Sequence, residues 1–539
     1  MTQPIPIDRP PRIQPELPFG EIDIPKPPEK RTDGWMRLLQ VALPAITIFG
    51  YILMSAFGGM GRNPWFMVPM VLSIVASIIF SVYTFQREKK EQARQARIYA
   101  ARLVEINKEM LAAHEQQRRF YVHNYPDVAT AMNLVEIARQ EAMRAAHPLR
   151  SQARLWERRT DDDDFGVLRL GMGALPSTVV YNVQDADPFT EDPQLRAAMK
   201  IADDSRFVPD IPVIIALRPP AEERTDEEPG EREEEAQAKE QQVVRTPAAH
   251  AVAIAGERQA VYAYIRALLT HFTVFHSHLD AKLLGVAQKE QEWGWATQLP
   301  HSKGGEQEAQ WCFLDAALDE EEAALREDEE ETPYLRFLED IRRTLAQRKL
   351  QLEERDDSNQ GATSNKDVTL PFLLLTVDLM DAAYNTDSPL REIESDAALS
   401  ILLDAGGALG AAAIFLVPDR SKAPSQCTAV IEVERGAQPS NRKQEKGSRT
   451  LSFRYAETGV NSVRYLGVAD VVESADKMAG LARNLAACQI RRSYGAEIAT
   501  GVGFLNLMGL ASIQELQTSA LQRWQESVTP QQANWLRTK

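Results

Sequence analysis

Two long uncharged stretches dominate the pattern of hydrophobic and polar positions along the chain. They cover residues 38–57 and 65–85, and only the segment from Gly58 to Pro64 separates them. A helix rises about 1.5 Å per residue, so a stretch of about 20 residues spans about 30 Å, the thickness of the hydrocarbon core of a bilayer. The pattern therefore predicts a transmembrane hairpin within residues 36–85. A buried core hairpin in a soluble domain is the alternative interpretation.

Basic residues flank both stretches, whereas the connecting loop contains only Arg62. Positively charged residues stay on the cytoplasmic side of a membrane, so both termini are predicted to be cytoplasmic. The basic cluster after the second stretch is also suited to anionic lipid headgroups. The flanking basic residues are Lys26, Lys30, Arg31 and Arg37 before the first stretch, and Arg87, Lys89, Lys90, Arg94 and Arg97 after the second.

The first 35 residues form a proline-rich tail, with nine prolines between Pro4 and Pro28. Proline at this density favours an extended, solvated chain without a core of its own. Two interpretations remain open for this tail: a docking peptide for a neighbouring protein, and a plain leader.

Residues 86–160 are predicted to form a helical stalk. A first helix over 86–122 places Tyr99, Leu103, Ile106, Met110 and Ala113 at the alternating spacing of a coiled-coil seam. The seam is only about two heptads long, so we expect it to pack on its own domain rather than to form a long dimeric coil. A second helix is predicted over about 127–158.

Residues 161–500 have the alternation of strands and helices that is typical of an α/β domain with a largely parallel sheet covered on both faces. An acidic insert at 219–242 and a second acidic run at 319–331 are predicted to be solvated. Residues 501–539 are predicted to be a helical linker. The expected strands are 166–171, 177–183, 211–217, 252–255, 282–287, 370–377 and 411–417, with an added hairpin of 428–434 and 450–456; the expected helices are 259–273, 334–353 and 474–488.

The best candidate for chemistry is a nucleotide site formed by Gly256 and Asp378. Gly256 follows a short apolar strand and precedes a helix, as in a phosphate-binding loop, and Asp378 ends an apolar strand, as a magnesium-binding aspartate does. The loop nevertheless lacks the required lysine and hydroxyl residue, and Glu257 would repel phosphate. No intact phosphate-binding loop occurs in the sequence. We therefore predict a nucleotide-binding fold that has lost its chemistry, with Asp378 as a strand-end cap, although a weak live site is an alternative.

Other residue types give weaker signals. The net charge of −16 argues against an electrostatic grip on nucleic acid. The cysteines at 312, 427 and 488 are too far apart to suggest a disulfide framework or a zinc site. His276 and His278 near the end of a predicted helix would diverge, so no metal site is predicted there. No catalytic residue and no cofactor is assigned within this chain.

Several motifs occur in an order that resembles the N-terminal half of EccC, the membrane-anchored FtsK/SpoIIIE-type ATPase family of type VII (ESX) secretion systems. The resemblance covers nearly the whole chain, and its most specific parts are Arg154–Arg159 and Trp293–His301. The similar stretches are Arg9–Arg12, Pro15–Pro18 and Gly20–Ile22, the two uncharged runs, Arg154–Arg159 with Phe165 and Leu168–Gly171, Trp293–Trp295 with Leu299–His301, and Leu370–Asp378 with Asp387–Leu390.

The resemblance implies a membrane anchor, a stalk and an inactive, FtsK-like ATPase domain at the bacterial inner membrane. Full-length family members would be ATPases that use ATP and magnesium in downstream modules, but no position of this sequence matches those hydrolysing residues. Implied partners are inner-membrane components of the secretion complex, further copies of the chain, membrane lipid and, indirectly, secreted proteins. The alternatives are a membrane-anchored DNA translocase of the FtsK/SpoIIIE class and a membrane-tethered nucleotide-binding scaffold.

Overall fold

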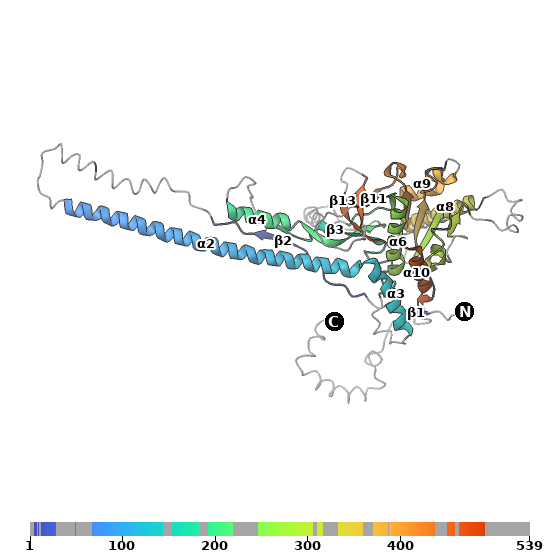
Figure 1. Cartoon of the computed structure of the whole chain (residues 1–539), viewed down its shortest axis with the longest axis horizontal. Helices are drawn as coiled ribbons and strands as arrows, with labels where there is room; N and C mark the ends of the chain where they lie inside the picture. Colours follow the sequence, from blue (N-terminus) through green and yellow to red (C-terminus); the bar gives the residue numbers. More distant parts are fainter. Residues whose placement is uncertain are drawn as a thin grey trace, which may run out of the picture. The chain divides into compact units, whose positions relative to one another are not determined.

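The computed structural model describes residues 5–7, 9, 12–28, 49, 67–143, 154–183, 192–218, 246–304, 310–315, 332–358, 370–385, 388–436, 450–458 and 463–490. Met1–Gln489 form one compact unit, and Ile490–Lys539 form a second. The elements described below belong to the first unit (Figure 1). The acidic segments at 219–242 and 319–331 and the predicted linker at 501–539 lie outside the described residues.

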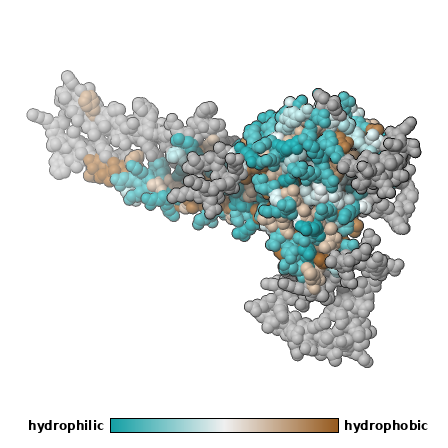
Figure 2. Space-filling view, turned by 45° about the vertical axis from the view of Figure 1, so that its right-hand side comes forward, coloured by the Kyte–Doolittle hydropathy of each residue, from teal (hydrophilic) through white to brown (hydrophobic). Residues whose placement is uncertain are grey.

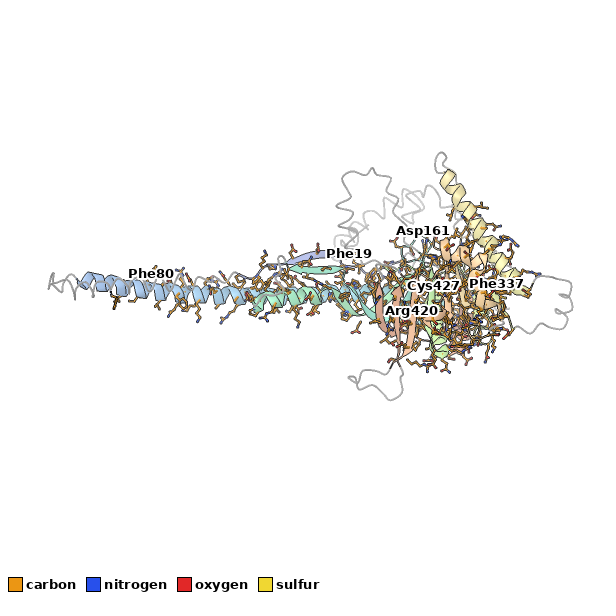
Figure 3. All side chains as sticks on the ribbon, turned by 90° about the horizontal axis from the view of Figure 1, so that it is seen from above. Phe19, Phe80, Asp161, Phe337, Arg420 and Cys427 are labelled. Carbon is orange, nitrogen blue, oxygen red and sulfur yellow. The ribbon has the colours of Figure 1, made fainter. Side chains whose placement is uncertain are left out.

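The long helix α2, Met67–Asn124, contains most of the second uncharged stretch. Its beginning exposes large apolar side chains, among them Leu72, Ile79 and Phe80. Figure 2 shows this hydrophobic surface at the start of the helix, and Phe80 projects from it in Figure 3. Of the first stretch, only Phe49 lies within the described residues. A search of the described residues finds no helix long and apolar enough to cross a membrane, so the two spans stay a prediction.

The predicted seam of the stalk packs on elements of the same chain, as expected. Tyr99, Leu103, Ile106 and Met110 are buried in a cluster with residues of β2, β4 and α4, and Ala113 packs against that cluster. These elements are β2 (Gly20–Ile24), β4 (Val179–Val183) and α4 (Pro193–Asp204), and β2 pairs with β4 in a parallel two-stranded sheet. Asp192 begins α4 by accepting a hydrogen bond from the Gln194 amide.

A ten-stranded mixed sheet forms the body of the unit, in the order β5-β3-β13-β12-β11-β6-β10-β9-β7-β8. Strands from β11 to β8 are parallel, whereas those from β5 to β11 are antiparallel. The strands are β3 (Val167–Pro176), β5 (Phe207–Ala216), β6 (Ala251–Gly256), β7 (Ala281–Ala287), β8 (Trp311–Phe313), β9 (Phe372–Asp378), β10 (Ala411–Val417), β11 (Ala429–Arg435), β12 (Leu451–Glu457) and β13 (Arg464–Ala469).

Helices cover the two faces of the parallel part, because its strands are apolar on both sides. One face of β6, β9 and β10 packs in a single core with α8 and α9; that core includes Phe337 and Cys427, which are labelled in Figure 3. α6 lies across β3, β6 and β11 on the other face, and α3 and α10 pack against α6. The helices are α3 (Val128–Met143), α6 (Arg258–Phe275), α8 (Pro333–Ser358), α9 (Ala397–Ala405) and α10 (Ala475–Ala486).

Most predicted strands and helices of residues 250–490 are confirmed with small shifts of their ends. The sheet is mixed rather than largely parallel, because antiparallel pairings of β12 with β13, β13 with β3, and β3 with β5 extend it beyond the predicted hairpin. The elements that the sequence did not suggest are short or lie at edges: β1 (Ile5–Ile7), β2, β8, β13, β14 (Cys488–Ile490), α4, α9 and the 3-10 turns η3 (Ala296–Gln298), η4 (Pro300–Ser302), η5 (Pro389–Ser395) and η6 (Arg420–Lys422).

Two predictions for the N-terminal part are wrong. The second stalk helix was expected over 127–158, but α3 ends at Met143, and residues 154–160 form turns. Trp156 there has a left-handed backbone, with a φ of 59°, which a helix does not allow. The proline-rich tail was expected to be solvated, yet Ile7 and Ile24 are each only 1% exposed, and Ile24 packs against α2.

Candidate functional site

The carboxyl ends of the parallel strands bring the two predicted nucleotide-site residues to one edge of the sheet. In the strand register Ala255 lies beside Val417, and Leu416 lies beside Asp378. Gly256 and Asp378 are therefore at the same edge with β10 between their strands. Ligands of open α/β sheets bind at this edge, so a ligand site of this sheet is expected here.

The connection between β6 and α6 is a single residue, Glu257, because β6 ends at Gly256 and α6 begins at Arg258. A phosphate-binding loop needs several residues between its strand and its helix to wrap backbone amides around a phosphate. Gly256 has a φ of +156°, and a side-chain carbon there would lie 2.4 Å from the Val433 carbonyl oxygen. The glycine is thus explained by the close approach of β11.

Glu257 is the N-cap residue of α6, and its side chain makes no capping hydrogen bond. A carboxylate beside the partial positive charge of a helix N-terminus nevertheless makes this position less favourable for a second anion. Oε2 of Glu257 lies 3.7 Å from Nε of Arg435 on β11. The chain therefore supplies both the anion and its cationic partner at this position.

Asp378 is 5% exposed, and the chain itself satisfies its carboxylate. Oδ2 accepts hydrogen bonds from the Tyr262 hydroxyl at 2.7 Å and from the Trp293 indole nitrogen at 2.9 Å. Oδ1 accepts from the Met380 amide at 3.0 Å, which is the geometry of a strand-end cap. Burial raises the pKa of Asp378, while the bonds from Trp293 and Tyr262 oppose that rise. These partners occupy the oxygens that a metal ion would need.

An ion pair closes the outer side of this cluster. Arg258 donates from both terminal nitrogens to Asp381, and its guanidinium lies 5.8 Å from the centroid of the Tyr262 ring. The hydrogen bond that Arg258 donates to Asp381 raises the pKa of Arg258. The sequence did not indicate Tyr262, Arg258 or Asp381 as site residues; the signal present was an arginine and a tyrosine one helical turn apart.

A second buried polar cluster lies where α2 meets the sheet and centres on Arg158, which is fully buried. Its guanidinium donates to the Val167 carbonyl at 2.6 Å and the Asn124 carbonyl at 3.0 Å, and its Nε lies 3.2 Å from Asp164. It also lies over the rings of Tyr125 and Phe275, 4.9 and 4.8 Å from their centroids. The sequence placed Arg158 in the Arg154–Arg159 motif and did not indicate Asp164 as its partner.

The histidines around the end of α6 are structural within the described part of the chain. Nε2 of His276 accepts from the Gly166 amide at 2.9 Å, and Nε2 of His301 contacts the His276 carbonyl at 2.8 Å. Burial lowers the pKa of both rings to about 3. No group of three or more histidine, cysteine, aspartate or glutamate residues among the described residues is placed to hold a metal ion.

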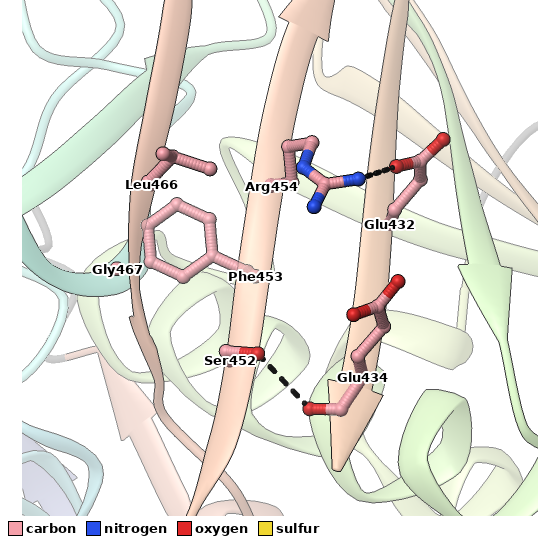
Figure 4. A pocket seen from close by; sticks show the side chains of 7 residues that line it. All are labelled: Glu432, Glu434, Ser452, Phe453, Arg454, Leu466 and Gly467. Carbon is pink, nitrogen blue, oxygen red and sulfur yellow. Dashed lines mark hydrogen bonds and ion pairs between the residues drawn. The ribbon is translucent and has the colours of Figure 1, made fainter. Parts of the chain in front are cut away.

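Two surface hollows occur in the described part of the chain. One of about 230 Å³ lies near the amino ends of β9 and β10 and includes Asp161, Arg348 and Phe372. The other, of about 110 Å³, lies on the open face of β11, β12 and β13 (Figure 4). There the Arg454 guanidinium donates to Glu432 at 2.9 Å, and the ring of Phe453 lies beside Gly467. Neither hollow includes Gly256 or Asp378.

Comparison with known proteins finds homologues named EccC over about half of the chain. EccC of Thermomonospora curvata is 26% identical over 313 residues, which cover 54% of this chain and 19% of that protein. EccC of Geobacillus thermodenitrificans is 22% identical over 302 residues, covering 54% and 17%, respectively. EccC3 of the Mycobacterium tuberculosis ESX-3 system is 26% identical over 294 residues, covering 52% and 19%. The chain thus spans less than a fifth of the length of these relatives, and no family model matches it.

Solved structures give a distant likeness only. The cytoplasmic domain of the T. curvata type VII secretion ATPase EccC has a TM-score of 0.32 and 12% identity, covering 62% of this chain and 32% of that one. ATPases 2 and 3 of the same protein, in complex with a signal sequence peptide, have a TM-score of 0.30 and 14% identity, covering 61% and 48%. At such scores the arrangement of this chain has to be argued from its own strands.

Proposed function

We propose that this chain, whose homologues are EccC proteins of ESX secretion systems, is the anchoring and non-hydrolysing part of a type VII secretion motor. In this proposal it assembles with inner-membrane components of the secretion complex and with further copies of itself. Its sheet unit passes motion or regulation between ATPase modules and the membrane, and it contacts secreted proteins only indirectly. ATP and magnesium would act in other modules of the motor.

The observation that carries the non-hydrolysing role is the one-residue connection between β6 and α6. A connection of this length has no backbone amides to surround a phosphate chain, and its one residue is a glutamate. The internal partners of Asp378 support the same conclusion, because Tyr262 and Trp293 bond to Oδ2 and the Met380 amide bonds to Oδ1, the oxygens that magnesium would require. The sheet has the carboxyl edge at which nucleotides bind in related folds, but its described residues provide no loop there that could hold a phosphate. Such a domain is better suited to transmit motion than to hydrolyse ATP.

We expect the purified chain to show no magnesium-dependent ATP binding tighter than about 1 mM, because its strand-end site is filled by its own side chains. Isothermal titration with MgATP, together with a phosphate-release assay, measures this. The matched control is Asp378→Asn, which removes the carboxylate at the end of β9. Tight binding or hydrolysis by the wild type that disappears in Asp378→Asn would show that the site is live and would overturn the proposal.

Membrane anchoring is the second part of the proposal and rests on the uncharged stretches at 38–57 and 65–85. Support comes from the contact between the segments that flank them: the Tyr99 hydroxyl on α2 donates to the Pro25 carbonyl at 2.8 Å. Pro25 precedes the first stretch and Tyr99 follows the second, so the chain leaves and returns on the same side. Two spans with both ends cytoplasmic satisfy this requirement, and the basic flanks favour the same orientation.

Expressed with its native sequence, the chain is expected to stay in the membrane fraction after washing with alkaline carbonate and to require detergent for release. The matched control replaces Ile48, Phe49, Ile74 and Val75 by aspartate, since charges at the centres of the stretches oppose insertion. Release of the wild type by carbonate alone would rule out spanning and leave at most surface attachment.

A further inference from the structure

The proline-rich tail of this chain runs as an extended arm along α2 and contacts several separate parts of the unit. At its start, the Ile5 amide donates to the Ala487 carbonyl at 2.8 Å, next to β14. At its end, Ile24 is buried against Tyr99 and Leu103 of α2. Between these points the arm crosses the Arg158 cluster. It therefore joins the C-terminal end of the sheet unit, the junction with α2 and the stalk.

The length of the arm matches the length of helix beside it. The Ile13 carbonyl contacts Nε2 of His123, and the Pro25 carbonyl accepts from Tyr99. Twelve residues of polyproline-type chain extend about 37 Å, and the 24 residues of α2 between the two contacts rise about 36 Å. The arm is thus nearly fully extended, and its prolines reduce the entropy that would be lost in holding it so.

Arg12 is the strongest single contact of the arm. Its side chain is 10% exposed and donates twice to Asp164, at 2.6 and 2.7 Å, and once to the Asn124 side-chain oxygen at 3.1 Å. Glu157 and Asp162 lie 3.9 Å from the same guanidinium. Paired donation of this kind is among the strong hydrogen bonds of proteins. Asn124 ends α2 and Asp164 precedes β3, so Arg12 bridges the stalk and the sheet.

Arg9 adds a second bridge toward the end of α6. Its guanidinium donates to Asp280 at 2.8 Å and to the Arg158 carbonyl at 2.8 Å. Across the described part of the arm, few apolar side chains are buried; Ile7 and Ile24 are the most buried of them. An element held mainly by charged contacts and a few apolar anchors can detach without unfolding the core beneath it.

We propose that residues 12–25, which Ile5 and Arg9 help to hold in place, form a releasable strap that locks α2 onto the sheet unit, and that Arg12 is its latch. The strap closes when Arg12 enters the acceptor site of Asp164, Asn124, Glu157 and Asp162. It opens as one unit from Arg12 to β2 and uncovers Tyr99 and Leu103, which leaves α2 free to change its packing. This inference rests on the contacts of the arm and holds whether or not the chain hydrolyses ATP.

Hydrogen–deuterium exchange of the full-length chain tests the strap. In Arg12→Ala the amides of β2, residues 20–24, are expected to exchange at least about tenfold faster, while those of α6 and β9 keep their wild-type rates. Arg12→Lys keeps the charge but loses the paired donation. Its β2 exchange rate is expected to lie between those of the wild type and Arg12→Ala. The control is Arg102→Ala, which removes an exposed α2 arginine paired with Glu105 and Glu109.

Two further measurements test the strap if Arg12→Ala loosens the whole unit. Raising KCl should speed exchange of β2 in the wild type without affecting α6, because screening weakens the latch. A synthetic peptide of residues 5–25 should slow the exchange of residues 99–110 in Arg12→Ala, whereas the same peptide carrying Arg12→Ala should not. Exchange of β2 that is unchanged by the variant and by salt, or that rises only together with α6 and β9, would overturn the strap.

Discussion

Replacing Arg158 by methionine is expected to lower the free energy of unfolding by about 3–5 kcal/mol, the range found when one partner of a buried ion pair is removed. The guanidinium is fully buried, and it satisfies two backbone carbonyls as well as pairing with Asp164. Methionine fills part of the volume but leaves those carbonyls without a donor and Asp164 with Arg12 alone. Urea unfolding followed by circular dichroism measures the loss.

The matched control is Arg206→Met, because Arg206 is 66% exposed and its 3.5 Å ion pair with Asp203 is on the surface. That change should cost no more than about 1 kcal/mol. The double variant Arg158→Met/Asp164→Asn should lose less than the sum of the two single losses, because Arg158 and Asp164 are in contact and each single change removes the same ion pair. A cost for Arg158→Met as small as that of the control would mean that the cluster does not hold the junction together.

Acidification from about pH 7 to about pH 5 is expected to destabilise the fold through its buried histidines. Burial is the main cause that lowers the pKa of His276 and His301 to about 3 and that of His271 well below its ordinary value; Arg158 adds to the shift for His271 and His276. In the unfolded chain each ring titrates near about 6.5. Between about pH 6.5 and about pH 3 the unfolded state therefore binds protons that the native state does not bind. The free energy of unfolding consequently decreases as the pH is lowered.

At about pH 5 this linkage costs about 2 kcal/mol for His276 and a similar amount for His301. Asp378 and Asp470 act in the opposite direction, because burial raises the pKa of each. Comparing urea unfolding at the two pH values measures the net effect. His276→Gln keeps an acceptor for the Gly166 amide, and His301→Gln keeps a donor for the His276 carbonyl. Each variant should reduce the pH difference by about 2 kcal/mol; an unchanged difference would exclude these rings as its source.

The parallel half of the sheet was predictable because its strands are continuous apolar runs that periodicity reveals. Leu370–Val377 and Ala411–Val417 were predicted almost as β9 and β10 appear. The antiparallel half was harder, since β13 is short and exposes Leu466 and Val468. Its pairing depends on partners far away in the sequence, such as Gly467 beside Gly173. Local pattern carries no information about such register.

The error at residues 154–158 has a specific cause. Arg154 and Glu157 have the spacing of a helical ion pair, and they do form one, at 2.6 Å. The backbone nevertheless pairs elsewhere: the Trp156 amide donates to Val274 and the Arg158 amide to Phe275, at the end of α6. Tertiary hydrogen bonds therefore override a local helical pattern at this point. Gly256 and Asp378 lie at one edge of the sheet, as the ends of their apolar strands indicated. Tyr262 and Trp293 were missed because their partner, Asp378, is far away in the sequence.

The contact between Pro25 and Tyr99 makes the chain between them a closed loop, whatever that loop contains. Because the arm and α2 belong to one chain, the arm stays near its own contact sites and rebinds there more readily than a separate molecule does. A free peptide, or the arm of a neighbouring copy, must compete against that tethered arm. Exchange of arms between copies is therefore suppressed until the Arg12 contacts of a chain are weakened. Opening of the strap consequently depends on the chain that carries it and not on the concentration of neighbouring copies.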